Sequence, residues 1–167
     1  MRIVFLIALC CAMLIVGCYG FFQAKTLRKG DRAPDFVLHD YQGQEFSLKT
    51  ALNNNNWVVL VFYPKDASLI CTKQLCRIRD VMPQLPHHVK VIGVSSDSAQ
   101  SHKTFSQQNS LSFPLAIDED NHVRKLYGAH TLGGRVTVII NPQGYVHEIC
   151  SDAISLKEHI AMIERLK

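Results

Sequence analysis

Two cysteines five residues apart are the residues of this chain best suited to chemistry. Cys71 and Cys76 lie in the segment "SLICTKQLC", which follows the apolar run 57–63 and Pro64. Apolar residues recur with helical spacing after Cys71, so we expect a helix that begins there. Backbone N–H groups at a helix N-terminus carry partial positive charge, and this charge favours ionisation of a thiol to the nucleophilic thiolate.

The residues just before Cys71 could form a substrate pocket. Pro64 ends the strand because it cannot donate a ladder hydrogen bond, and the Ser68 hydroxyl can both donate and accept. We expect Leu69 and Ile70 to cover the thiol and keep bulk water away. These features predict a site for a small, neutral, oxygen-rich substrate. The alternative is a core cysteine without chemistry, since cysteine is among the most buried residue types.

The spacing of the two cysteines restricts how they can pair. Residues five apart on a helix are separated by roughly 7.5 Å along its axis. A disulfide needs Cα atoms within about 7 Å and converging side chains. Cys71 and Cys76 therefore cannot bridge while the helix is intact. The spacing suits a bond that forms and breaks as the first helical turns unwind, rather than a permanent staple.

Strand and helix patterns alternate along the chain. We expect a polar loop at 51–56, and the remaining patterns predict a hairpin at 35–48, strands at 57–63, 89–96 and 113–118, helices at 71–82, 99–109, 122–128 and 155–166, and a hairpin at 135–150. Alternating strands and helices followed by an antiparallel hairpin indicate an α/β fold, with a mixed sheet covered by helices on both faces.

The first twenty residues read as an export signal. A single basic residue precedes the apolar run 3–16, and "IVGC" ends at Cys18 as in a bacterial lipobox, which predicts lipidation of that cysteine. Two alternatives are a membrane anchor over 3–22 and cleavage after Gly20 or Ala24. Each exports the domain to the periplasmic side of a bacterial membrane or to the periplasm. We therefore divide the chain into a leader, 1–24, and one domain, 25–167.

Charge and residue spacing argue against several other functions. The net charge of +4 comes from scattered basic residues, so we predict no nucleic-acid partner. The eight histidines show no metal-ligand spacing, and there is no glycine-rich phosphate loop. We predict no metal and no cofactor. Cys150 ends a strand, and we interpret it as a core or sheet-edge thiol.

The motifs around Cys71 resemble those of the peroxiredoxins. "PKDASLIC" is similar to their signature of proline, three residues, Thr or Ser, two residues and cysteine. "FYPKD…CTKQLC" resembles the bacterioferritin comigratory protein branch, also called the PrxQ class. The resemblance runs from about Lys29 to the C-terminus and includes "APDFVLHDYQGQEFSL" and "GRVTVIINPQG". It implies a thioredoxin-like fold.

The resemblance also implies a role for each site residue. Cys71 would attack the peroxide O–O bond as a thiolate and become a sulfenic acid. Ser68 would hydrogen-bond the peroxide, Pro64 would shield the pocket, and the guanidinium of Arg135 would hold Cys71 as thiolate. Cys76 would condense with the sulfenic acid to a disulfide. A thioredoxin-like thiol reductant would then reset the enzyme, acting on a monomer or weak dimer.

The chain departs from the family pattern in three places. Ser68 replaces the commoner threonine, "SLIC" replaces "TPGC", and Cys150 is an additional cysteine that could rival Cys76 as the resolving thiol. We still expect reduction of hydrogen peroxide and organic hydroperoxides. Two alternatives remain at this point: an exported thiol–disulfide oxidoreductase on the same fold, and a lipid-anchored, non-enzymatic module whose Cys71–Cys76 bond is structural.

Overall fold

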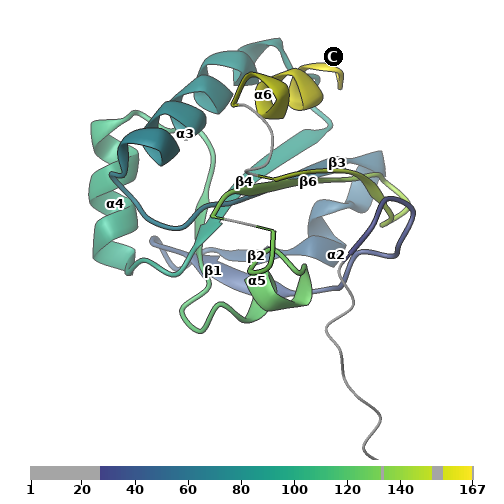
Figure 1. Ribbon diagram of the computed structural model, residues 1–167, viewed down its shortest axis with the longest axis horizontal. Coiled ribbons are helices and arrows are strands. Elements are labelled where there is room, and N and C mark those ends of the chain that lie inside the picture. The colour runs from purple at the N-terminus through teal and green to yellow at the C-terminus, as the bar shows by residue number, and fades with distance from the viewer. Residues whose placement is uncertain (1–26, 133, 152–155, 167) are drawn as a thin grey trace, which may run out of the picture.

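A mixed β-sheet forms the centre of the domain (Figure 1). The computed structural model describes residues 27–132, 134–151 and 156–166. Within these residues the sheet has seven strands in the order β2-β1-β5-β4-β3-β6-β7. The strands are β1 (Val37–Asp40), β2 (Glu45–Ser47), β3 (Trp57–Phe62), β4 (Val89–Ser95), β5 (Leu115–Ile117), β6 (Val136–Ile140) and β7 (Val146–Ser151).

Helices cover both faces of this sheet. They are α2 (Leu48–Ala51), α3 (Leu69–Val81), α4 (Ala99–Gln108), α5 (His122–Leu126) and α6 (Leu156–Glu164), with 3₁₀ turns η1 (Asn53–Asn55) and η2 (Met82–Gln84). In Figure 1, α3 and α6 lie above the sheet, whereas α2 and α5 lie below it. The α/β fold class and the mixed sheet flanked by helices are therefore confirmed.

The alternation of side chains along β3 explains the two layers. Successive residues of a strand point to opposite faces, and every residue from 58 to 63 is buried. Val58, Leu60 and Phe62 join a core cluster with α2 and α5. Val59, Val61 and Tyr63 join a second cluster with α3, α4 and α6. A strand buried on both faces is what the continuous apolar run predicts.

The predicted loop at 51–56 is wrong in part. Ala51 ends α2, and Asn53–Asn55 form the η1 turn. The helix arises because the Ser47 side chain caps it, accepting a hydrogen bond from the Thr50 backbone N–H at 3.4 Å. Two asparagines then adopt left-handed backbone angles, which Asn tolerates better than most residues.

Three strand ends converge where the chemistry is expected. β3 pairs with β4 in parallel and with β6 antiparallel, and Phe62 lies opposite both Val94 and Val136. The carboxyl ends of β3 and β4 therefore meet the start of β6 at one end of the sheet. The loop to Cys71 leaves β3 at this end, and Arg135 directly precedes β6. This arrangement brings Cys71 and Arg135, which are 64 positions apart in the sequence, to the same end of the sheet.

The other predicted elements are present with small changes of boundary. The helix at Cys71 begins two residues earlier than predicted, at Leu69, because Ser68 caps it. The leader over 1–24, including Cys18, and the predicted first residue of the C-terminal helix lie outside the described residues. In the described part of the chain, no helix has both the length and the apolar character needed to cross a bilayer.

Candidate active site

Cys71 is a buried residue in the first turn of α3. Its side chain is 1% exposed, and its backbone N–H donates to Ser68 Oγ at 3.4 Å. The Ser68 carbonyl accepts from both the backbone N–H and the hydroxyl of Thr72, at 2.8 and 2.9 Å. The predicted position at a helix N-terminus is confirmed. Ser68, which we had considered only as a contact for substrate, is also the N-cap of the helix.

The expected apolar cover over Cys71 is wrong. Leu69 and Ile70 are 71% and 56% exposed. Successive helical residues turn by about 100°, so when Cys71 faces the sheet the two residues before it face outward. The thiol is buried instead by the core cluster beneath α3, which includes Tyr63 and Leu75. Pro64, expected to shield the pocket, is an exposed residue of the loop.

Arg135 lies at the same end of the sheet as Cys71. The β3–β6 register continues from Phe62–Val136 to place Arg135 opposite Tyr63, the last residue before the loop. Arg135 is half-buried. Burial and two glutamates raise the pKa of the Cys150 thiol, and the positive charge of Arg135 acts in the opposite direction. One end of the sheet therefore holds the residues predicted from the sequence: Pro64, Ser68, Cys71 and Arg135.

Cys76 lies one and a half turns further along α3. It is half-buried, and its Sγ donates to Asn109 Oδ1 at the C-terminal end of α4, at 3.6 Å. Cys71, Cys76 and Cys150 are all free thiols. The structural-disulfide alternative requires a non-helical segment after Cys71, but α3 is continuous from Leu69 to Val81. The intact helix holds the two cysteines apart, as the spacing predicts.

Cys150 is placed in the core, as we expected. It is 1% exposed and lies opposite Thr137 in the β6–β7 pair. Burial raises its pKa to about 12, with further increases from Glu158 and Glu148. A thiol with such a pKa is almost entirely protonated at neutral pH, so it is a poor nucleophile.

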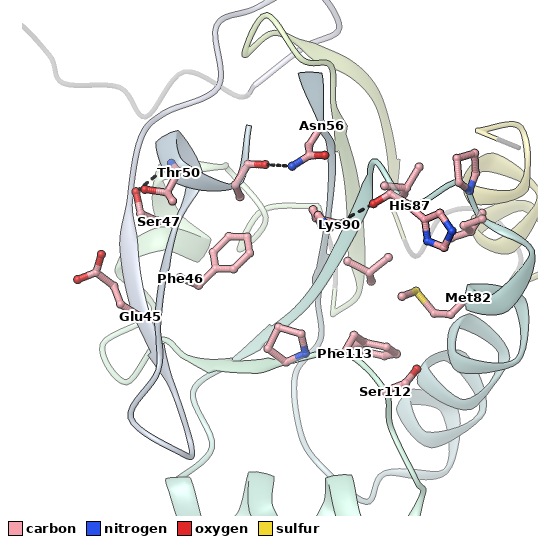
Figure 2. A pocket seen from close by; sticks show the side chains of 16 residues that line it. Glu45, Phe46, Ser47, Thr50, Asn56, Met82, His87, Lys90, Ser112 and Phe113 are labelled. Carbon is pink, nitrogen blue, oxygen red and sulfur yellow. Dashed lines mark hydrogen bonds between the residues drawn. The ribbon is translucent and has the colours of Figure 1, made fainter. Parts of the chain in front are cut away.

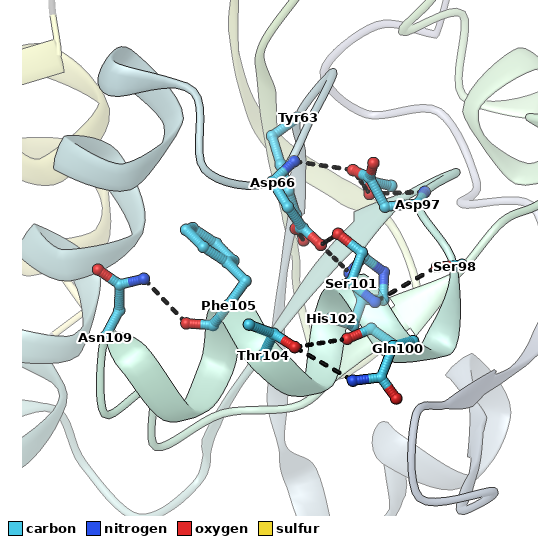
Figure 3. A network of polar contacts seen from close by, with 11 residues as sticks. Tyr63, Asp66, Asp97, Ser98, Gln100, Ser101, His102, Thr104, Phe105 and Asn109 are labelled. Atoms are coloured by element: carbon cyan, nitrogen blue, oxygen red, sulfur yellow. Dashed lines mark hydrogen bonds and ion pairs between the residues drawn. The ribbon is translucent and has the colours of Figure 1, made fainter.

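A buried polar network beside the site was not predicted from the sequence (Figure 3). The carboxylate of Asp66 accepts hydrogen bonds from Tyr63 Oη at 2.9 Å and Ser101 Oγ at 2.7 Å, and pairs with His102 Nδ1 at 2.8 Å. Asp66 and His102 are 5% and 0% exposed. The residues come from the segment that follows β3 and from α4, and no local sequence pattern connects positions 36 apart.

A second polar cluster lies under α3. Gln74 Nε2 approaches Thr137 Oγ1 at 3.5 Å and His159 Nδ1 at 3.4 Å, and all three side chains are buried. His159 Nε2 lies 3.1 Å from the Ser151 carbonyl, so Nε2 is the donor in that contact. Gln74 Oε1 is buried without a hydrogen-bond partner among the described residues. The sequence signal that could have indicated this cluster is Gln74, a polar residue on the otherwise apolar face of the predicted helix.

A separate cavity of about 500 Å³ lies at the far end of the sheet (Figure 2). Its lining includes Val89 at the start of β4, together with Phe46, Met82 and Phe113. Val89 begins β4 at the end opposite to the loop that leads from β3 to Cys71, because β3 and β4 are parallel. None of the described residues that line the cavity is a cysteine. We therefore place the candidate active site at the end of the sheet where Cys71 lies.

Comparison with known proteins identifies relatives over most of the domain. The profile of the AhpC/TSA family matches residues 29–149. The chloroplastic peroxiredoxin Q of Oryza sativa subsp. japonica is 38% identical over 138 residues, a match that spans 79% of this chain and 63% of that protein. The chloroplastic peroxiredoxin Q of Arabidopsis thaliana is 39% identical over 149 residues, spanning 84% of this chain and 67% of that protein. This chain thus matches less than two thirds of the rice relative.

Solved structures confirm the thioredoxin-like fold implied by the resemblance. The bacterioferritin comigratory protein of Xanthomonas campestris superposes with a TM-score of 0.71 at 25% identity, covering 84% of this chain and 95% of that one. That structure concerns the alkyl peroxide reduction activity of the Xanthomonas protein. Similarity in fold and in sequence therefore extends over the same domain.

Proposed function

The chain belongs to the AhpC/TSA family, among relatives named peroxiredoxin Q, and we propose that it is a thiol-dependent peroxidase. The observation that carries the proposal is the position of Cys71. It lies at a capped helix N-terminus, and Cys76 lies in the same helix. The partial positive charge of the helix N-terminus faces this residue, and a second thiol is near enough to react after local unwinding.

In the first step, the Cys71 thiolate attacks one oxygen of the peroxide. An S–O bond forms as the O–O bond breaks, the sulfur is oxidised to a sulfenic acid, and the other oxygen leaves as hydroxide or alkoxide and takes up a proton. We assign Ser68 to hydrogen-bond the peroxide, Pro64 to shield the site and Arg135 to stabilise the thiolate and the developing negative charge. The capped helix N-terminus supports the same charge.

In the second step, Cys76 attacks the sulfur of the sulfenic acid. An S–S bond forms, the S–O bond breaks, and water leaves with the thiol proton. The first turns of α3 must unwind for this step, because an intact helix separates the two residues by roughly 7.5 Å along its axis. Two thiols of a thioredoxin-type reductant then return both cysteines to the thiol state and become a disulfide themselves.

We propose hydrogen peroxide and organic hydroperoxides as substrates. The alkyl peroxide reduction activity of the Xanthomonas relative supports the organic class. The exposed Leu69 and Ile70 beside Cys71 provide apolar surface for an alkyl group, in place of the proline and glycine of the usual motif.

The experiment compares peroxide consumption by the reduced wild-type protein, Cys71→Ser and Cys150→Ala, with a dithiol as reductant. We expect wild type and Cys150→Ala to consume both peroxide classes and Cys71→Ser to be inactive. Equal activity in Cys71→Ser would exclude the proposed role of that cysteine. Dithiol–disulfide exchange without peroxide consumption would favour a thiol–disulfide oxidoreductase instead.

We further propose that the domain over 25–167 is exported and held at the periplasmic side of a bacterial membrane, through lipidated Cys18 or an anchor within 1–24. The apolar run ending in "IVGC" supports this assignment. Mass spectrometry of the mature protein should find a lipid on Cys18 with no residue before it, or an intact Met1 if the leader is an uncleaved anchor. An unmodified mature protein that begins after Gly20 or Ala24 would instead place it free in the periplasm.

A further inference from the structure

The loop between β3 and α3, Pro64–Ser68, is held in a strained shape. Ala67 has φ of +54°, in the left-handed region. An L-alanine occupies that region roughly five- to thirtyfold less readily than the right-handed regions. Such a conformation persists only where surrounding contacts impose it. The residue next to Ala67 is Ser68, which caps α3 and fixes the backbone of Cys71.

The contacts that impose this shape come from Asp66. Its carboxylate binds the Tyr63 hydroxyl on one oxygen and Ser101 and His102 on the other, so it is tied both to the residue that follows β3 and to α4 (Figure 3). Its backbone N–H donates to Asp97 Oδ2 at 2.8 Å. No other residue of the Pro64–Ser68 loop is buried. Asp66 is therefore the point at which this loop is fixed to the domain.

Asp97 extends the same support to the end of β4. Its Oδ2 also accepts a hydrogen bond from Ser95 Oγ at 2.9 Å. The loop is thus anchored to the residue that follows β3, to the end of β4 and to α4 at once. Hydrogen bonds to an ionised, buried carboxylate are among the stronger ones in proteins, which suits it to hold a strained neighbour.

We propose that Asp66 is a positioning residue for peroxide reduction: it holds the Pro64–Ser68 loop so that Ser68 and Cys71 are aligned for reaction. This inference rests on the proposed peroxidase function. It also implies that Asp66 marks the fixed end of the local unfolding. The first turns of α3 open for the Cys71–Cys76 disulfide while the loop before them stays anchored, so the reactive arrangement can re-form after reduction.

The test compares Asp66→Ala and Asp66→Asn with wild type in a Cys76→Ser background, where the sulfenic acid cannot be resolved. The rate of Cys71 oxidation by hydrogen peroxide is measured by rapid quench and mass spectrometry. We expect Asp66→Ala to react at least tenfold more slowly. Asp66→Asn should lose less, because its amide oxygen can still accept from Tyr63. The matched control is Lys65→Ala in the exposed part of the same loop, expected within twofold of the background protein.

Two further readouts separate positioning from a general loss of stability. Glycine enters the left-handed region without the alanine penalty, so Ala67→Gly should restore about fivefold in rate to Asp66→Ala but change the parent rate by less than twofold. Amide hydrogen exchange over residues 67–72 should also increase in Asp66→Ala and not in Lys65→Ala. If Asp66→Ala fails to fold, the same comparisons are made with Asp66→Asn.

The outcomes distinguish this inference from the proposed function. An Asp66→Ala protein that reacts with peroxide within twofold of its parent would overturn the positioning role. An equal gain from Ala67→Gly with and without Asp66 would also overturn it. If the wild-type protein does not react with peroxide at all, the proposed function fails. Hydrogen exchange over 67–72 then decides whether Asp66 positions the loop.

Discussion

Replacement of Gln74 should slow formation of the Cys71–Cys76 disulfide. Gln74 lies between the two cysteines on α3, and its buried Oε1 has no hydrogen-bond partner among the described residues. A buried polar atom left unsatisfied costs about 1–3 kcal/mol. When α3 unwinds, this oxygen reaches water and the cost disappears. The wild-type sequence therefore lowers the free energy needed for the opening that Cys76 requires.

The magnitude follows from the contacts that a leucine would remove. Gln74→Leu eliminates the unsatisfied oxygen but also loses two long contacts, at 3.4 and 3.5 Å, to His159 and Thr137. The hydrogen bond of 3.0 Å between those two partners remains. We expect a net stabilisation of folded α3 by ~1 kcal/mol, which reduces the unwound population about fivefold.

The assay adds one equivalent of peroxide to the reduced protein and follows the disulfide by rapid quench and mass spectrometry. Gln74→Leu should form it about fivefold more slowly, with a higher thermal unfolding midpoint and more Cys71 sulfinic acid at excess peroxide. Leucine is preferred to methionine because peroxide can oxidise a thioether. Gln108→Leu, at an exposed position of α4, is the matched control. Disulfide formation at the wild-type rate, or a lower unfolding midpoint, would show that the buried oxygen of Gln74 does not favour the opening of α3.

Three other predictions concern neighbouring groups. Cys150→Ala should leave the peroxide-induced Cys71–Cys76 disulfide intact. With a pKa of about 12, fewer than about one in ten thousand Cys150 thiols are ionised at pH 7. A Cys71–Cys150 disulfide found by peptide mapping of the wild-type protein would contradict this. Ser68→Ala should remove the N-cap of α3, destabilise the protein by ~1 kcal/mol in denaturant titrations and slow the peroxide reaction at least tenfold. Ser68→Thr should keep both the stability and the rate. An unchanged rate in Ser68→Ala would count against a role of the N-cap in the reaction. Burial of Asp66 would raise its pKa, but hydrogen bonds from His102, Ser101 and Tyr63 outweigh this and hold the pKa below the usual 3.8. The stabilisation from ionised Asp66 is therefore present above pH 3.8 and is lost as the pH falls through the lower pKa of the folded state. The unfolding midpoint should fall more steeply below pH 3.8 in wild type than in Asp66→Asn. Equal slopes for the two proteins would contradict this prediction.

The fold was predictable because its signals are local. The continuous run over β3 predicts a strand buried on both faces, and the helical stripe after Cys71 predicts α3. The turn over 141–144 predicts the β6–β7 hairpin, which the register confirms. The short helix α2 was missed because it depends on a single cap by Ser47 rather than on a periodic pattern.

The candidate site was predictable only where it follows the chain. The position of Cys71 at the start of a helix was predicted from the order of strand, loop and helix, whereas the role of Ser68 as the N-cap of that helix was not predicted. Leu69 and Ile70 were misplaced because the helix begins at Leu69 and not at Cys71, so both residues face outward when Cys71 faces the sheet. Asp66 and His102 were missed because their contact joins a loop to a distant helix, and only the tertiary fold brings them together.

The thiols that react with peroxide can be identified in a single experiment. The reduced protein is mixed with one equivalent of hydrogen peroxide, and the products are mapped by mass spectrometry. We expect fast loss of two hydrogens, located at a Cys71–Cys76 disulfide and abolished by Cys71→Ser. Slow oxidation spread over Cys71, Cys76 and Cys150, unchanged by that substitution, would contradict it.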